Sequence, residues 1–295
     1  MRSEPTRLGP LECLLTLPAG PETGPPLLLV HGLGGGIWGW DFFQRYFAKR
    51  GSRSYAVELP GHGDLRDPAT AARMGTFSVE TYALWVAAAL HELNREAGPC
   101  VVVGHSMGGL VAQKLAESHV QLGYVFLASA PPWHMFRRAY WPIWKHLLRH
   151  PWREVLLPLT GNTLVLDSRL QDALVNNRLP PAVRAEIYCR DVPDSGRASM
   201  QMVVGLVSVD TNRVTSPCLV VAGSDDRLIP PCEQRRLADF YRCPIQLHDR
   251  GHMLMLEDGW QEVAEGILAW SASLQLAAGP ELPRPAPSAA VTRAS

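Results

Sequence analysis

Long apolar runs and an excess of one charge are both missing from this chain of 295 residues. No stretch of eighteen or more apolar residues occurs, so no segment has the composition of a membrane-spanning helix. Residues 1–5 lack the apolar segment of a signal peptide, and we therefore expect a cytoplasmic protein. The chain has 28 basic and 28 acidic residues, which argues against a nucleic-acid partner or a general affinity for acidic substrates.

Clustered cysteines are missing as well. The six cysteines form no C-x-x-C pair and do not group with histidines in a pattern typical of metal ligands. Several lie in apolar, strand-like segments, where cysteine behaves as a small buried hydrophobe. We expect no structural metal and no obligatory disulfide.

The most informative feature that is present is the hexamer Gly-His-Ser-Met-Gly-Gly at 104–109, directly after the apolar run 100–103. The run indicates a buried strand, and apolar positions from Met107 onward recur at helical spacing. A serine between a strand and a helix, with glycine two positions to either side, is the pattern of a nucleophile elbow. A serine that merely caps a helix is the simpler alternative, but the flanking strand and helix favour Ser106 as a nucleophile.

Two later segments contain the partners that such a nucleophile needs. A serine hydroxyl is a weak nucleophile near neutral pH, so it requires a base and a group that orients the base. The apolar run 217–223 is followed by Asp225 and Asp226, and a final strand pattern at 244–248 is followed by His252. Either aspartate could orient the histidine. His248 lies inside the expected strand, so His252 is the favoured base.

With serine, acid and histidine in this order, the chain resembles the α/β-hydrolase family over about residues 27–274. The family spacing of glycine, aspartate and proline falls on Gly223, Asp226 and Pro230, which favours Asp226 over Asp225 without excluding the latter. The resemblance also covers the apolar run 27–30 and the glycine-rich loop that follows it. It implies an oxyanion hole formed by the backbone N–H groups of Leu33 and Met107.

The resemblance implies an α/β fold: a mostly parallel central sheet with helices on both faces and a helical cap insertion. Alternating strand and helix patterns support such a sheet. Residues 1–130 and 214–276 are expected to form the core, with room for one or two short strands before residue 27. Residues 131–213 are expected to form the cap, and the proline-rich segment 277–295 is expected to be disordered.

The first part of the expected cap is rich in aromatic and basic residues. An amphipathic helix that covers the site with its aromatic face is the simpler interpretation. The alternative is an apolar acyl pocket with a basic rim, which would attract anionic head groups or a membrane surface. We expect the substrate pocket to include His105, Trp133, Phe136, Tyr140 and Trp141.

The predicted function is a cofactor-independent serine hydrolase that cleaves a carboxylic ester of a medium-sized apolar or lipid-like small molecule through an acyl-enzyme on Ser106. Cleavage of a thioester or a carbon–carbon bond by the same three residues is an alternative. A ligand receptor with this fold and little turnover is an alternative of another class. Weak membrane contact through the cap stays open, and so does the oligomeric state.

Overall fold

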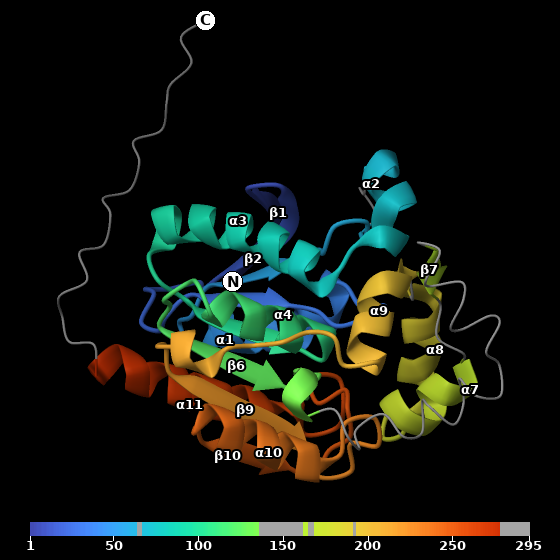
Figure 1. The fold of residues 1–295 in the computed structure, drawn as a ribbon. Helices are drawn as coiled ribbons and strands as arrows, with labels where there is room; N and C mark the ends of the chain where they lie inside the picture. Colours follow the sequence, from blue (N-terminus) through green and yellow to red (C-terminus); the bar gives the residue numbers. More distant parts are fainter. Residues whose placement is uncertain (64–66, 136–161, 165–167, 191–192, 278–295) are drawn as a thin grey trace, which may run out of the picture.

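The central sheet of this computed structural model has eight strands in the order β1-β2-β4-β3-β5-β6-β9-β10 (Figure 1). The structure describes residues 1–63, 67–135, 162–164, 168–190 and 193–277. The strands are β1 (Arg2–Leu8), β2 (Leu11–Leu17), β3 (Leu27–Val30), β4 (Ser54–Val57), β5 (Val101–His105), β6 (Gly123–Leu127), β9 (Cys218–Gly223) and β10 (Ile245–His248). Neighbouring strands from β4 to β10 pair in parallel, whereas β2 is antiparallel to β4 and to β1.

The segment before β3 forms a hairpin of two seven-residue strands, which agrees with the expected number of strands there. The hairpin turns at Gly9, whose φ of 54° lies in the left-handed region that glycine adopts readily.

Helices cover both faces of the sheet, because alternate residues of the buried strands point to opposite sides. On β5, Val102 packs with the apolar faces of α3 (Val79–Ala97), α4 (Met107–Ala116) and α10 (Pro231–Tyr241). Val101 and Val103 pack on the other side with α1 (Asp41–Lys49) and α11 (Trp260–Ala277). The prediction of a mostly parallel sheet between two helical layers is therefore confirmed.

The segment between β6 and β9 interrupts this alternation. Its described elements are η3 (Trp133–Met135), β7 (Thr163–Leu164), α7 (Ser168–Leu170), the π-helical turn η5 (Gln171–Val175), α8 (Pro181–Arg190), β8 (Asp194–Ser195), α9 (Gly196–Val203) and η6 (Thr211–Arg213). The short strands β7 and β8 pair antiparallel, a feature that two-residue strands cannot reveal through sequence periodicity. Figure 1 shows α7, α8 and α9 gathered on one side of the molecule.

Candidate active site

Ser106 lies in the sharp turn between β5 and α4. Its φ of 53° and ψ of −115° form a backbone conformation that a residue with a side chain rarely adopts. The turn is held because the N–H of Ser106 donates to the carbonyl of Leu127 at 3.0 Å, and the carbonyl of Ser106 accepts the N–H of Ala130 at 3.0 Å. This strained, anchored turn is the local geometry expected of a nucleophile elbow.

The glycines around Ser106 are required by close backbone contacts. A Cβ on Gly104 would lie 2.2 Å from the carbonyl oxygen of Gly108, and one on Gly108 would lie 2.3 Å from that of Val30. Both separations are far below van der Waals contact, and both neighbours are backbone atoms. The start of α4 therefore packs directly against β3 and β5 only if these positions carry no side chain.

Asp226 and His252 form a buried pair. Nδ1 of His252 lies 2.8 Å from Oδ2 of Asp226, and both side chains are almost fully buried. The second oxygen of Asp226 accepts the N–H groups of Leu228 and Ile229 at 2.9 and 2.8 Å. The carboxylate is thus fixed on both oxygens, and it fixes the ring of His252 in turn. Ser106 and His252 line the same pocket.

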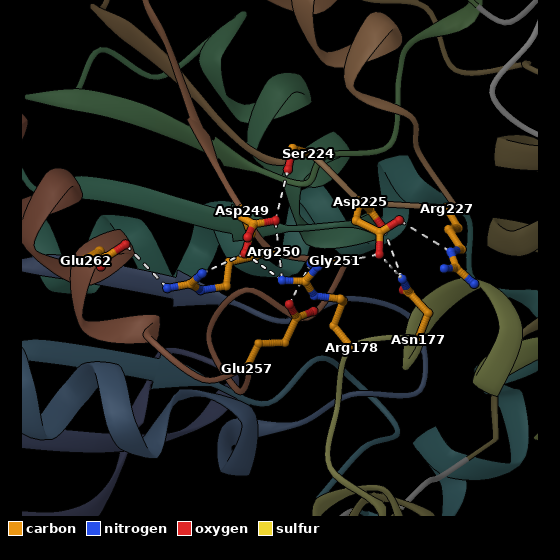
Figure 2. A network of polar contacts seen from close by, with 10 residues as sticks. All are labelled: Asn177, Arg178, Ser224, Asp225, Arg227, Asp249, Arg250, Gly251, Glu257 and Glu262. Carbon is orange, nitrogen blue, oxygen red and sulfur yellow. Dashed lines mark hydrogen bonds and ion pairs between the residues drawn. The ribbon is translucent and has the colours of Figure 1, made fainter.

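Asp225 has other partners, which Figure 2 shows. Its side chain is about one-third exposed and contacts residues of the segment between β6 and β9. The amide of Asn177 donates to Oδ2 of Asp225 at 3.1 Å and to its backbone carbonyl at 3.0 Å. Arg178 also lies 3.8 Å from Oδ2 of Asp225, and Arg227 lies 3.4 Å from Oδ1. Of the two aspartates that the sequence leaves open, Asp226 is the one that contacts His252.

Glu257 supports the loop that carries His252. Its carboxylate is buried and accepts the N–H groups of Gly251 at 2.5 Å and Met253 at 3.1 Å, the residues on either side of His252. Burial raises the pKa of Glu257, while the two N–H donors partly oppose that rise. Glu257 is not among the residues predicted from the sequence, because its only local signal is its place five positions after His252.

His105 supports the same loop from the sheet. Its Nε2 lies 3.0 Å from the backbone carbonyl of His252, to which it donates, and the two rings are 4.9 Å apart. Burial, together with the proximity of His252, holds the pKa of His105 well below its usual value. His105 is among the residues that line the pocket, and its role towards the substrate stays a prediction.

Leu33, in the glycine-rich loop after β3, is among the residues that line the pocket. The carbonyl of Gly32, in the peptide unit that carries the Leu33 N–H, is held by Nδ1 of His31 at 2.9 Å and by the N–H of Gly35 at 3.1 Å. In a trans peptide the N–H points opposite to the carbonyl. These two bonds therefore set the direction of the Leu33 N–H.

His31 serves this loop as a neutral donor. Its Nε2 accepts the N–H of Leu59 at 3.0 Å, so its proton lies on Nδ1, which faces Gly32. Burial, with a contribution from nearby His62, lowers the pKa of His31 to about 3.

Met107, the other predicted oxyanion donor, is the first residue of α4. The first N–H groups of a helix have no acceptor within the helix. The Met107 N–H therefore has no helical partner, which suits the role expected for it.

The pocket is lined mainly by apolar side chains. Trp38 and Trp40 come from the core, and Leu174, Ile187 and Met202 come from the segment between β6 and β9. Among the described lining residues, histidine is the only type with a titratable side chain. Such a lining suits an uncharged, apolar ligand.

One expectation about the pocket is wrong. Trp133 does not line it, because η3 turns its side chain outward, where it is 55% exposed, while Met135 of the same turn is buried. Phe136, Tyr140 and Trp141 lie outside the described residues, as does most of the aromatic and basic stretch to which they belong.

The described parts of the chain show no candidate metal site, membrane-spanning helix or disulfide. No cluster of three or more potential metal ligands occurs there. Among the helices of those parts, none has the length and apolar character needed to cross a bilayer. All six cysteines are free thiols.

Comparisons with known proteins agree with this architecture. A model of the alpha/beta hydrolase family matches residues 27–266. The dihydrolipoyllysine-residue acetyltransferase component of the acetoin cleaving system from Pseudomonas putida is 28% identical over 261 residues. The match covers 85% of this chain and 64% of that relative, so this chain spans just under two thirds of its length.

Solved structures with a similar fold include enzymes that act on esters. A monoacylglycerol lipase from Paleococcus ferrophilus superposes with a TM-score of 0.65 and 24% identity, over 90% of this chain and 99% of the other. A thermophilic esterase from Thermogutta terrifontis superposes with a TM-score of 0.63 and 21% identity, over 93% and 99%. At these identities the likeness shows the fold.

Proposed function

The chain belongs to the alpha/beta hydrolase family, and from this premise we propose that it is a serine hydrolase that cleaves carboxylic esters through an acyl-enzyme on Ser106. One observation carries the proposal: His252, which is paired with buried Asp226, lines the same apolar pocket as Ser106 in its strained turn. A nucleophile, a base and an oriented acid are the groups that acyl transfer requires.

In the proposed reaction, His252 takes the proton of the Ser106 hydroxyl as its oxygen attacks the ester carbonyl. Asp226 holds His252 in the required tautomer and stabilises the imidazolium that forms. The carbonyl oxygen becomes negatively charged and accepts the N–H groups of Leu33 and Met107. His252 then protonates the leaving alcohol, and water repeats the sequence to release the acid.

The substrate we propose is an uncharged ester with a medium-sized apolar or lipid-like acyl group. The apolar lining of the pocket supports this choice, because an anionic or cationic group would lose its hydration there without a described charged partner. The similar structures named as a lipase and an esterase point in the same direction.

Labelling with a fluorophosphonate, which reacts with activated serines, tests the nucleophile. We expect the wild type to be labelled and to hydrolyse nitrophenyl esters, and Ser106→Ala to do neither. A folded wild type that is not labelled would contradict the proposal. Tight ligand binding without turnover would support the receptor interpretation instead.

A panel of esters tests the substrate class. Activity should rise from acetate to medium-length acyl chains and fall when the acyl chain ends in a carboxylate. Including thioesters and a substrate with a cleavable carbon–carbon bond separates the alternatives, because faster cleavage of either would replace the ester assignment.

A further inference from the structure

Asp194 places a carboxylate from the segment between β6 and β9 deep inside the core. It is the first residue of β8 and is only 1% exposed. Oδ2 accepts the N–H of Gly34 at 2.9 Å and lies 3.0 Å from Nε2 of His62. Oδ1 accepts the hydroxyl of Tyr82 at 2.8 Å and the N–H of Ser195 at 2.5 Å. All four contacts have hydrogen-bond geometry, so each carboxylate oxygen accepts two hydrogen bonds.

The carboxylate is charged where it lies. Burial alone would raise its pKa, but the charge of His62 and the hydrogen bonds from His62, Gly34 and Ser195 outweigh burial and lower the pKa to about 2. Burial has the opposite effect on a histidine and would lower the pKa of His62, but the attraction of Asp194 outweighs burial and raises that pKa. Asp194 and His62 thus form a buried hydrogen-bonded pair in the interior. Burying a charged carboxylate is costly, so its position calls for an explanation beyond stability.

Gly34 is adjacent to Leu33, whose N–H is a proposed oxyanion donor. The N–H of Gly34 belongs to the peptide unit that follows Leu33, and the carbonyl of Gly32 belongs to the unit that precedes it. Asp194 holds the following unit, while His31 and Gly35 hold the preceding one. Holding both peptide units fixes the backbone angles of Leu33. The φ of Gly34 is 67°, which lies in the left-handed region that glycine adopts readily, so the backbone can turn here to present its N–H to Asp194.

We propose that Asp194 is a positioning residue that holds the oxyanion loop, residues 31–35, in its catalytic conformation, and so makes the hole depend on the segment between β6 and β9. This inference rests on the proposed function, because it takes Leu33 as an oxyanion donor. Asp194 acts through Gly34 and does not itself touch the reacting atoms.

The test compares Asp194→Asn with Tyr82→Phe. Asparagine has nearly the same shape as aspartate but only one acceptor oxygen and no charge. It therefore cannot accept hydrogen bonds both from the donors on Oδ1 and from those on Oδ2. Tyr82→Phe removes a contact to Oδ1 alone and leaves Oδ2 on Gly34, which makes it the matched control for disturbance of the buried network.

For Asp194→Asn on a nitrophenyl ester, we expect kcat to fall roughly 10- to 100-fold while KM changes less than about twofold. Affinity for a trifluoromethyl ketone, whose adduct carries an oxyanion, should fall by the same factor. Tyr82→Phe should keep wild-type values of both. Partial unfolding alone would also lower the apparent kcat with KM unchanged, so kcat is referred to the folded fraction measured by circular dichroism. Unfolding would not weaken the affinity of the folded enzyme for the ketone, so that affinity separates the two causes.

Three results would overturn the inference. One is a folded Asp194→Asn with wild-type kcat, and another is an equal loss of kcat in the two variants. If Asp194→Asn does not fold, hydrogen exchange of the wild type decides, since rapid exchange of the Gly34 amide would show that Asp194 does not hold it. A wild type that neither hydrolyses esters nor reacts with a fluorophosphonate contradicts the proposed function, whereas these three results concern Asp194 only.

Discussion

Glu257 brackets His252, because its carboxylate accepts the N–H of the residue before the histidine and of the residue after it. Glu257→Gln leaves one acceptor oxygen for two donors, so one side of the loop is released. We expect kcat to fall about 10-fold with little change in KM, since the base is displaced and the pocket is not. Steady-state kinetics on a nitrophenyl ester measure both constants.

Glu262→Gln is the control for this substitution. Its side chain is largely exposed and lies 3.3 Å from Arg250, and an ion pair whose carboxylate is open to solvent contributes little. It should keep wild-type kinetics. If Glu257→Gln also keeps wild-type kinetics, the two hydrogen bonds from Gly251 and Met253 to Glu257 have no role in placing His252.

Asp226 and Asp225 are neighbours with different partners, and their asparagine variants should differ accordingly. Asp226→Asn should lower kcat by about 10⁴-fold, because an amide facing Nδ1 favours the wrong tautomer of His252. Asp225→Asn should change kcat only a few-fold, since it affects contacts to Asn177, Arg178 and Arg227. Kinetics of the two folded proteins decide the matter, and a larger loss for Asp225→Asn would reverse the assignment.

Gly108→Ala should destabilise the protein, because its methyl group would meet the backbone oxygens of Val30 and His31. Overpacking of this kind typically costs about 1–3 kcal/mol, and rigid backbone neighbours favour the upper end. Gly20→Ala, where the added methyl meets nothing within 4 Å, should change the free energy of unfolding by less than about 1 kcal/mol. Urea unfolding compares the two, and equal stabilities would mean that the start of α4 can shift away from β3.

Acidification should destabilise the protein through two of its buried histidines, His31 and His105, whereas the raised pKa of His62 acts in the opposite direction. The pKa of His31 is about 3 when folded and about 6.5 in an unfolded chain. Between these values the unfolded state binds the extra proton, so the free energy of unfolding falls as pH falls, by about 1.4 kcal/mol per pH unit for this group. His105, whose pKa is also lowered, acts in the same direction.

His31→Gln isolates that contribution. We expect the free energy of unfolding, measured in urea at pH 6.0 and pH 4.5, to fall less in the variant than in the wild type. The difference should correspond to one proton, which is about 1.4 kcal/mol per pH unit. Equal losses would mean that His31 takes up its proton within the folded state.

The site residues predicted from the sequence are those marked by local patterns. Ser106 has a strand before it and a helix after it, and Asp226 and His252 each follow a strand in the expected order. The parallel sheet followed from the same runs. Asp194 could not be found, because its contact with Gly34 joins residues 160 positions apart and leaves no local spacing. Trp133 was misplaced because aromatic content does not tell which way a single turn directs its side chain.

Asn177 and Arg178 bind the two loops that carry Asp226 and His252, through Asp225 and Asp249 (Figure 2). The segment that lines much of the pocket is therefore joined to the parts that are proposed to perform the chemistry. A chimera that exchanged residues 131–213 for those of a relative would inherit a new pocket wall but lose these attachments. Grafting for new specificity should succeed only where the donor segment brings its own equivalents of Asn177 and Arg178.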